Sequence, residues 1–185
     1  QKVGGLKKIE IAGSLRRFND TVKDIDILAS AENPHAVMDA FVSHLLVESV
    51  INRGDTKCSV RLINGINADL RVVSEPQFPY ALMYFTGSKA HNVALRGRAL
   101  KMGYKLNEYG LFPRDSETSE FLGSEKEVFK KLGLAFIPPE LREDRGELEA
   151  AESGSIPRLV EMSDIKGIFH VHTPYSDGLA SIREY

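Results

Sequence analysis

Two aspartates inside an apolar segment constrain this chain more than any other feature of its sequence. Asp24 and Asp26 alternate with Ile25 and Ile27 in the segment DIDILAS. Side chains two apart in a β-strand point to the same face, so the two carboxylates share one face and the two isoleucines share the other. The pattern therefore predicts a sheet with one buried face and, on the opposite face, two acidic groups about 6.6 Å apart along a strand.

A third acidic residue occupies a similar setting. Asp69 interrupts the apolar alternation of ADLRVV at 68–73. If its strand lies beside that of Asp24 and Asp26, three carboxylates converge and repel one another unless a cation neutralises them. Hard divalent cations such as Mg²⁺ take oxygen ligands, often together with phosphates, and a pair of them can hold both oxygens of an in-line displacement. This favours phosphoryl or nucleotidyl transfer, while a solvent-facing row of carboxylates is the alternative.

A Gly-Ser turn precedes the aspartates by ten residues. Gly13 and Ser14 follow the alternating strand pattern of residues 7–12, and Arg16 and Arg17 come directly after. Backbone N–H groups, a hydroxyl and two guanidinium groups suit a phosphate. The alternative is an ordinary turn with two surface arginines. The order of strand, Gly-Ser, acidic pair and later aspartate is more specific than any of its parts.

The remaining periodicity predicts an α+β fold with a mixed sheet. Asn33 and Pro34 indicate a helix start, Ser88 and Ser124 cap two later helices, and Gly103 and Gly133 end them. Acidic residues and a Ser-Gly-Ser run predict a linker near the end. The expected strands are 7–12, 24–30, 46–53, 57–63 and 68–73, the expected helices are 34–49, 76–86, 88–103 and 124–133 with a short one near 140, and the linker is expected over 143–158.

Composition and charge exclude some classes of protein. No apolar run approaches about 18 residues, so no membrane span is expected. The single cysteine, Cys58, excludes an internal disulfide framework and fits a reducing cytoplasm. The net charge is −2, but the stretch from Lys89 to Lys105 carries five basic residues and no acidic one. This stretch predicts either a polyanion-binding surface or a solvated helix face.

Longer stretches of the chain resemble a known family. GSLRRFNDTVKDIDILAS resembles the nucleotidyltransferase signature of the family X DNA polymerases, the polymerase beta-like family, and ADLRVV resembles its third carboxylate strand. YFTGSKAHNVALRGRALKMGYKLNEYGLF at 84–112 resembles the nucleotide-binding helix and the following thumb, and is the most specific part. GIFHVHTPYSDG resembles the start of the PHP domain that follows the polymerase in bacterial members.

This resemblance implies a domain plan. Residues 1–75 would form a nucleotidyltransferase-type palm, a mixed β-sheet flanked by helices, without the helix-hairpin-helix and fingers-like domains that usually precede it. Residues 76–142 would form a small α/β thumb that binds the nucleotide, residues 143–160 a linker, and residues 161–185 the N-terminal stub of a PHP domain. Without the preceding domains, most of the phosphate contacts that dominate DNA affinity would be missing.

The resemblance also implies roles for individual residues. Asp24 and Asp26 would bind two Mg²⁺ or Mn²⁺ ions, and Asp69 would bind the catalytic ion and orient the primer 3′-hydroxyl. The nucleotide-binding residues would be Ser14, Arg17, Tyr84, Phe85, Gly87 and Asn92, Arg96 would contact DNA on the templating side, and Asn107, Glu108 and Tyr109 would fasten the thumb. His170, His172 and Asp177 would be an incomplete PHP metal motif, filled only in the longer protein. His35, His44 and His91 lack ligand spacing and are expected at the surface or on a helix face.

The implied function is DNA-directed DNA synthesis, the transfer of a nucleotidyl group from a dNTP to a primer 3′-hydroxyl during short-gap repair. Primer-template or gapped DNA and the dNTP would be the partners of a cytoplasmic monomer. Lys89 stands where polymerase beta has an acidic residue, which favours the bacterial branch. Two alternatives stay open: a non-templated nucleotidyltransferase, and a non-catalytic DNA-docking piece of a PHP phosphoesterase or exonuclease. Whether these residues alone support turnover also stays open.

Overall fold

A five-stranded mixed sheet forms the N-terminal lobe of the computed structural model, which describes residues 4–167 and 170–184. Its strand order is β1-β2-β5-β4-β3, with β2 and β5 parallel and the other pairs antiparallel. The strands are β1 (Leu6–Ile11), β2 (Asp24–Ala31), β3 (Val47–Arg53), β4 (Lys57–Leu62) and β5 (Asn67–Val73). The α+β class and the mixed sheet predicted from the sequence are confirmed.

One face of this sheet is buried beneath helix α2 (Pro34–Val42). Leu70 in β5 and Val60 in β4 pack with Val37 and Met38 of the helix. Residues of β5 alternate between buried and partly exposed along the whole strand. A slip of one residue would turn this apolar set to solvent, so burial of one face fixes the register and turns Asp69 to the other face.

Helix α2 is shorter than the sequence predicted. Asn33 caps it as expected, because its Oδ1 accepts hydrogen bonds from the backbone N–H groups of His35 and Ala36 at 3.1 and 3.4 Å. The helix ends at Val42 rather than near residue 49, and β3 begins at Val47. Pairing of β3 with β4 gives the β-branched residues of VESVINR a place in the sheet, and this pairing outweighs the helical period in the segment.

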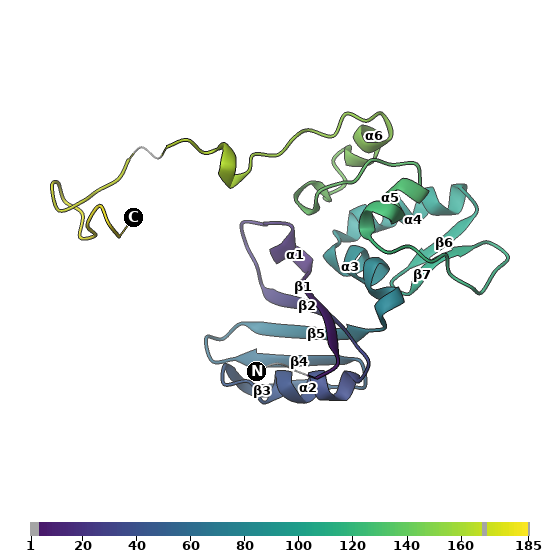
Figure 1. Cartoon of the computed structure of the whole chain (residues 1–185), viewed down its shortest axis with the longest axis horizontal. Helices are drawn as coiled ribbons and strands as arrows, with labels where there is room; N and C mark the ends of the chain where they lie inside the picture. Colours follow the sequence, from purple (N-terminus) through teal and green to yellow (C-terminus); the bar gives the residue numbers. More distant parts are fainter. Residues whose placement is uncertain (1–3, 168–169, 185) are drawn as a thin grey trace.

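The second lobe is built mainly from helices around a separate core (Figure 1). Phe129, Leu111 and Leu95 are fully or almost fully buried in it. The helices are α3 (Phe78–Thr86), α4 (Lys89–Lys101), α5 (Glu125–Lys131) and α6 (Glu147–Glu152), with a hairpin of β6 (Tyr104–Asn107) and β7 (Gly110–Pro113). Short 3₁₀ turns lie at Glu75–Gln77, Pro139–Leu141 and Met162–Asp164. Ser88 and Ser124 cap α4 and α5 as predicted.

Part of the segment expected to be a linker belongs to this core. Leu148 and Ala151 of α6 are buried in the same cluster as Phe129, and Ile156 packs against it. Their spacing of three residues places both on one face of the short helix. The acidic composition of the segment predicted solvent exposure, whereas this one apolar face is enough to pack it onto the lobe.

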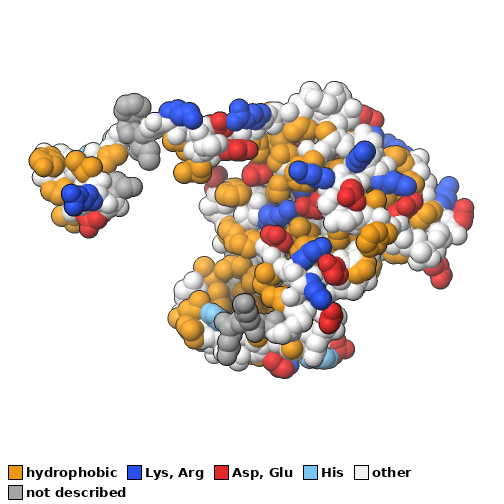
Figure 2. All heavy atoms as spheres, in the orientation of Figure 1, with side chains coloured by type: hydrophobic (Ala, Val, Ile, Leu, Met, Phe, Trp, Pro, Cys, Tyr) orange, Lys and Arg blue, Asp and Glu red, His pale blue; other side chains and the backbone are white. Residues whose placement is uncertain are grey.

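Beyond residue 157 the described residues extend away from both lobes (Figure 1), and Figure 2 shows this segment separate from the main body of the molecule in the same orientation. Residues 170–184, which include His170 and His172, contain no strand, and residues 168 and 169 lie outside the described part. A ring nitrogen of His172 hydrogen-bonds the carboxylate of Asp177. No helix in the described residues is long and apolar enough to cross a membrane. The bounds of the four predicted segments stay predictions.

Candidate active site

The register of β2 and β5 brings three aspartates to one edge of the sheet face opposite α2, beside the part of this face where Leu28 packs against α3. Asp26 lies directly opposite Asp69 in the parallel pair, and Asp24 lies opposite Asn67. Paired residues on neighbouring strands project to the same face. Asp24 is exposed, while Asp26 and Asp69 are partly buried. The condition set by the sequence, that the two strands be neighbours, is therefore met.

Negative charge is in excess at this edge. Burial raises the pKa of the Asp26 carboxyl above its ordinary value, and the charges of Asp24 and Asp69 raise it further. The nearby cations Lys57 and Arg17 act in the opposite direction without reversing the shift. Burial and two like charges disfavour the ionised form of Asp26, and a cation bound beside it would favour that form.

The donor chemistry of the three aspartates fits a hard divalent cation. Carboxylate oxygens are the ligands that Mg²⁺ and Mn²⁺ prefer, and the pKa of Asp26 is raised first by burial and then by the charges of Asp24 and Asp69. As they are positioned in the structure, however, no three acidic, histidine or cysteine side chains of the described residues form a group that could hold a metal ion. Asp69 is instead paired with Lys57, whose Nζ lies 3.1 Å from Oδ2.

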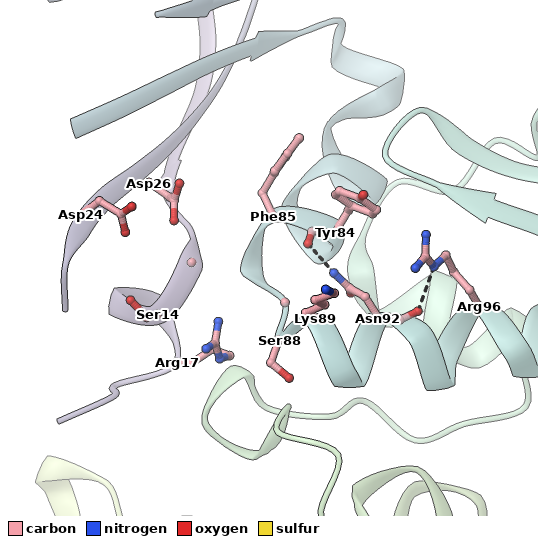
Figure 3. Close-up of a pocket in the computed structure, with 12 residues that line it drawn as sticks. Ser14, Arg17, Asp24, Asp26, Tyr84, Phe85, Ser88, Lys89, Asn92 and Arg96 are labelled. Carbon is pink, nitrogen blue, oxygen red and sulfur yellow. Dashed lines mark hydrogen bonds between the residues drawn. The ribbon is translucent and has the colours of Figure 1, made fainter. Parts of the chain in front are cut away.

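A cleft of about 440 Å³ separates the acidic edge from helices α3 and α4 (Figure 3). Asp69 lines an adjoining cavity of about 130 Å³, which shares Asp26 and Phe85 with the cleft. All predicted palm and thumb site residues therefore line one of these two spaces. The cleft is lined by Gly13, Ser14, Arg17, Asp24, Asp26, Tyr84, Phe85, Gly87, Ser88, Lys89, Asn92 and Arg96.

The Gly-Ser turn, which forms the short helix α1 (Gly13–Arg16), approaches Asp26 closely. The backbone N–H of Ala12 donates a hydrogen bond of 2.8 Å to the carbonyl oxygen of Asp26. Gly13 has a φ of +61°, and a Cβ at this position would overlap the Asp26 carboxylate. Glycine therefore allows the turn and the carboxylate to occupy the same end of the cleft.

We expect Gly13→Ala to destabilise the protein by about 1–3 kcal/mol, since the substitution adds left-handed backbone strain and a clash with Asp26. Chemical denaturation monitored by circular dichroism measures this loss. Gly65→Ala is the matched control, because Gly65 has a φ of +85° but a Cβ there would meet only the end of the Arg61 side chain at 3.6 Å. Equal losses in the two variants would show that backbone strain, and not the approach to Asp26, sets the requirement.

The two arginines after the turn are held by the second lobe. Arg17 lines the cleft, but its Nε donates to Glu143 and its Nη1 donates to the carbonyl oxygen of Thr86, both at 2.6 Å. Arg16 is not among the residues that line the cleft, and it bonds the Thr86 hydroxyl at 2.7 Å and Glu125 at 2.6 and 3.0 Å. Arg16 therefore joins the lobes, which corrects its expected place beside a phosphate.

Helices α3 and α4 present an aromatic and amide wall to the cleft. The Tyr84 and Phe85 rings meet edge to face with centroids 5.2 Å apart. The side-chain amide of Asn92 donates to the carbonyl oxygen of Tyr84 at 2.7 Å, and Arg96 Nε donates to the carbonyl oxygen of Asn92 at 3.2 Å (Figure 3). Gly87 lies between the helices with a φ of +72°. These bonds hold Asn92 and Arg96 against the backbone of the wall.

The basic stretch from Lys89 to Lys105 does not act as a single surface. Lys89 and Arg96 line the cleft, but Arg98 bonds the carbonyl oxygen of Leu132 at 2.7 Å and pairs with Glu152 at 3.0 Å. The helical period turns Arg98 toward the loop after α5 and toward α6, a position that neither of the two alternatives, a polyanion-binding surface or a solvated helix face, describes.

His91 lies in α4, on a helix face as one of its two expected positions, but this face is buried. Its side chain is fully buried, and its Nδ1 lies 2.7 Å from the Glu147 carboxylate. Burial lowers the pKa of His91, against the raising effect of its bond to Glu147. Histidine and carboxylate are 56 residues apart, so no local pattern indicated the pair.

The chain is similar to several known proteins. A family model described as DNA polymerase beta thumb matches residues 81–143. A Bacillus subtilis protein named DNA polymerase/3′-5′ exonuclease PolX is 42% identical over 179 residues, which are 96% of this chain and 31% of that protein. Repair DNA polymerase X of African swine fever virus (isolate Tick/South Africa/Pretoriuskop Pr4/1996) is 30% identical over 142 residues, which are 74% of this chain and 82% of the viral one.

A solved structure shares the fold. The crystal structure of Leishmania infantum polymerase beta, described as a ternary P/T complex, superposes with a TM-score of 0.64 at 29% identity and covers 73% of this chain and 67% of that one. The present chain thus spans about a third of the length of the Bacillus relative and most of the viral one.

Proposed function

Since this chain belongs to DNA polymerase family X, whose members are nucleotidyltransferases that use divalent metal ions, we propose that its cleft extends a primer by template-directed nucleotidyl transfer from a dNTP. Short-gap repair synthesis is the proposed setting, because the viral relative is named a repair polymerase. The match covers only 31% of the Bacillus relative, so the name of that relative does not establish activity for these 185 residues. Their activity by themselves is therefore part of the proposal.

One observation carries the proposal. The parallel register pairs Asp26 with Asp69, so Asp24 and Asp26 line the cleft of Ser14 and Tyr84 while Asp69 lines the cavity that adjoins it. Asp26 and Asp69 are 43 residues apart in sequence, and the pairing of their strands brings the two carboxylates to one site. A surface row of unrelated carboxylates would have no reason to face an aromatic and amide wall across a cleft.

The three aspartates are proposed to hold two divalent ions, with Mg²⁺ or Mn²⁺ as the candidates. When bound, these ions would neutralise the triphosphate charge and lower the pKa of the attacking hydroxyl. Asp69 would orient the primer 3′-hydroxyl and accept its proton. The hydroxyl oxygen would bond the α-phosphorus in line as the bond to the β-phosphate oxygen breaks, and pyrophosphate would leave with that electron pair.

The walls of the cleft would position the substrates. Ser14 is proposed to bind the triphosphate through its hydroxyl, with the immobilised Arg17 guanidinium beside it. Tyr84 and Phe85 would line the sugar and base, and the φ of Gly87 would let the backbone approach the nucleotide. Asn92 would contact the nucleotide edge, while Arg96 would reach the templating strand. Most of the catalytic effect of the protein would then come from position and electrostatics.

The histidine motif is proposed to belong to a second site that the described residues do not complete. His170 and His172 have ring centroids 4.9 Å apart, and Asp177 bonds His172. These three side chains would be the first ligands of a PHP metal site in a longer protein. No step of the polymerase proposal depends on them.

Extension of a one-nucleotide gapped DNA tests the proposed function. With Mg²⁺ and each dNTP in turn, we expect incorporation to follow the templating base. Incorporation that ignores the template would favour the non-templated nucleotidyltransferase. DNA binding without incorporation, under conditions in which the Bacillus protein extends the same gap, would favour a non-catalytic docking role.

A further inference from the structure

A lysine occupies the place beside the acidic edge where the proposed function requires a cation. Lys57 is the first residue of β4, and its Nζ lies 3.1 Å from Oδ2 of Asp69. Of the ion pairs found among residues 4–167 and 170–184, this is the one that involves Asp24, Asp26 or Asp69. The sequence analysis predicted a strand over 57–63 but assigned no role to Lys57.

The strand register brings Lys57 within reach of Asp69. Ser59 lies opposite Asp69 in the antiparallel pair of β4 and β5, and Lys57 lies opposite Arg71. Residues two apart share a face, so Lys57 is a diagonal neighbour of Asp69 on the sheet face opposite α2. Cys58, between Lys57 and Ser59, is fully buried on the other face.

The two arginines nearest the acidic edge are engaged elsewhere. Arg71 lies with its guanidinium carbon 4.5 Å from the centroid of the Phe85 ring. Arg17 bonds Glu143 and the carbonyl oxygen of Thr86. Each guanidinium is therefore fixed by another partner, whereas the ammonium group of Lys57 ends a flexible stem of four carbons.

We infer that Lys57 is a built-in counter-ion of Asp69, which holds this carboxylate in the metal-free protein and releases it when a divalent ion binds. The pair is well suited to exchange, since the side chains of Lys57 and Asp69 are 45% and 30% exposed. Ion pairs of this exposure contribute little to stability and break readily. This inference rests on the proposed function, because it assumes that the aspartates bind metal.

The inference makes Lys57 a positioning residue for Asp69 and a competitor of the metal ion. Without Lys57, Asp69 would be free and the field of the aspartates would no longer be offset by a nearby positive charge. We expect Lys57→Met to tighten binding of Mn²⁺ roughly three- to tenfold, the effect of removing one charge several ångströms from a divalent ion near a protein surface. Lys57→Arg, which keeps the charge, should restore the wild-type affinity to within about twofold.

Titration of the 185-residue protein with Mn²⁺, with free Mn²⁺ followed by electron paramagnetic resonance, measures this affinity without any turnover. Arg61→Met is the matched control, since Arg61 lies on the same face of β4 but bonds Asn67 at 3.0 Å. Asp26→Asn identifies the site, because it should abolish the binding that Lys57 modulates.

The outcomes separate the two proposals. Binding that is lost in Asp26→Asn but unchanged in Lys57→Met would overturn the counter-ion role alone, and so would weaker binding in Lys57→Met. Equal tightening in Lys57→Met and Arg61→Met would overturn it as well, because general surface charge would then explain the effect. Absence of Mn²⁺ binding in the wild-type protein would overturn both the counter-ion role and the proposed metal-dependent function.

Discussion

Replacing Asp26 with asparagine should reduce primer extension by on the order of 10³-fold while leaving the fold intact. Asp26 lies between the other two carboxylates, opposite Asp69 in the sheet and two residues from Asp24. An amide cannot supply the negative charge that two shared cations require. Single-turnover incorporation at saturating dNTP and Mg²⁺ measures the loss in the chemical step separately from any loss in nucleotide binding.

The same variant should not lower the free energy of unfolding in the absence of metal. Burial and two like charges raise the pKa of Asp26, so its ionised form is unfavourable in the folded protein. A neutral side chain of nearly equal volume removes that repulsion. Asp55→Asn, in the exposed turn between β3 and β4, is the control for general charge effects. Retained extension in Asp26→Asn, or loss of extension that only follows unfolding, would contradict the assigned role.

The acidic edge shows how far the sequence alone leads. Alternation of Asp24 and Asp26 with two isoleucines predicts their common face, because burial of one face fixes side-chain direction locally. Pairing with Asp69 could be stated only as a condition, since β3 and β4 intervene in the chain while β5 inserts beside β2. Hydrophobic period identifies strands but carries no information about which strand becomes a neighbour.

Tertiary ion pairs are the part that sequence reasoning missed. Arg17 and Glu143 are 126 residues apart, and His91 and Glu147 are 56 apart, so no spacing rule connects them. The resemblance implied that Arg17 binds phosphate. In the structure, Arg17 also connects the two lobes through its hydrogen bonds to Glu143 and Thr86. The acidic composition of α6 likewise led to the wrong prediction that the segment is exposed, although Leu148 and Ala151 are buried in the second core.

The largest stability effect is expected at Arg142, which is fully buried beneath α5. Its Nη1 bonds Glu125 at 2.7 Å, its Nε bonds the carbonyl oxygen of Ile137 at 3.0 Å, and its guanidinium lies about 5 Å from the Phe129 ring centre. We expect Arg142→Met to cost about 3–5 kcal/mol, because it leaves Glu125 buried with only Arg16 as a charged partner. Urea denaturation measures the loss.

The double variant Arg142→Met with Glu125→Gln separates a lost ion pair from lost packing. If the stranded charge causes the destabilisation, the double variant should be more stable than Arg142→Met alone. If it is less stable, packing of the Arg142 stem against the aromatic rings is the larger contribution, and the ion-pair account is wrong.

Acid denaturation gives an independent measure of the same network, which also links the lobes through Arg16. Burial by itself would raise the pKa of Glu125, but its hydrogen bond from Arg16 and the charge of Arg142 lower the pKa below its ordinary value. Its stabilising contribution is therefore complete above the unfolded-state pKa of about 4.3 and is lost as pH falls through the depressed folded-state pKa. Glu125→Gln should lack this component of the acid transition, whereas Glu117→Gln, an exposed control in the loop after β7, should retain it. Glu125 bonds both Arg16, in the turn of the first lobe, and Arg142, in the second lobe. Protonation of Glu125 at low pH should therefore weaken the contact between the lobes as well as the packing of the second lobe.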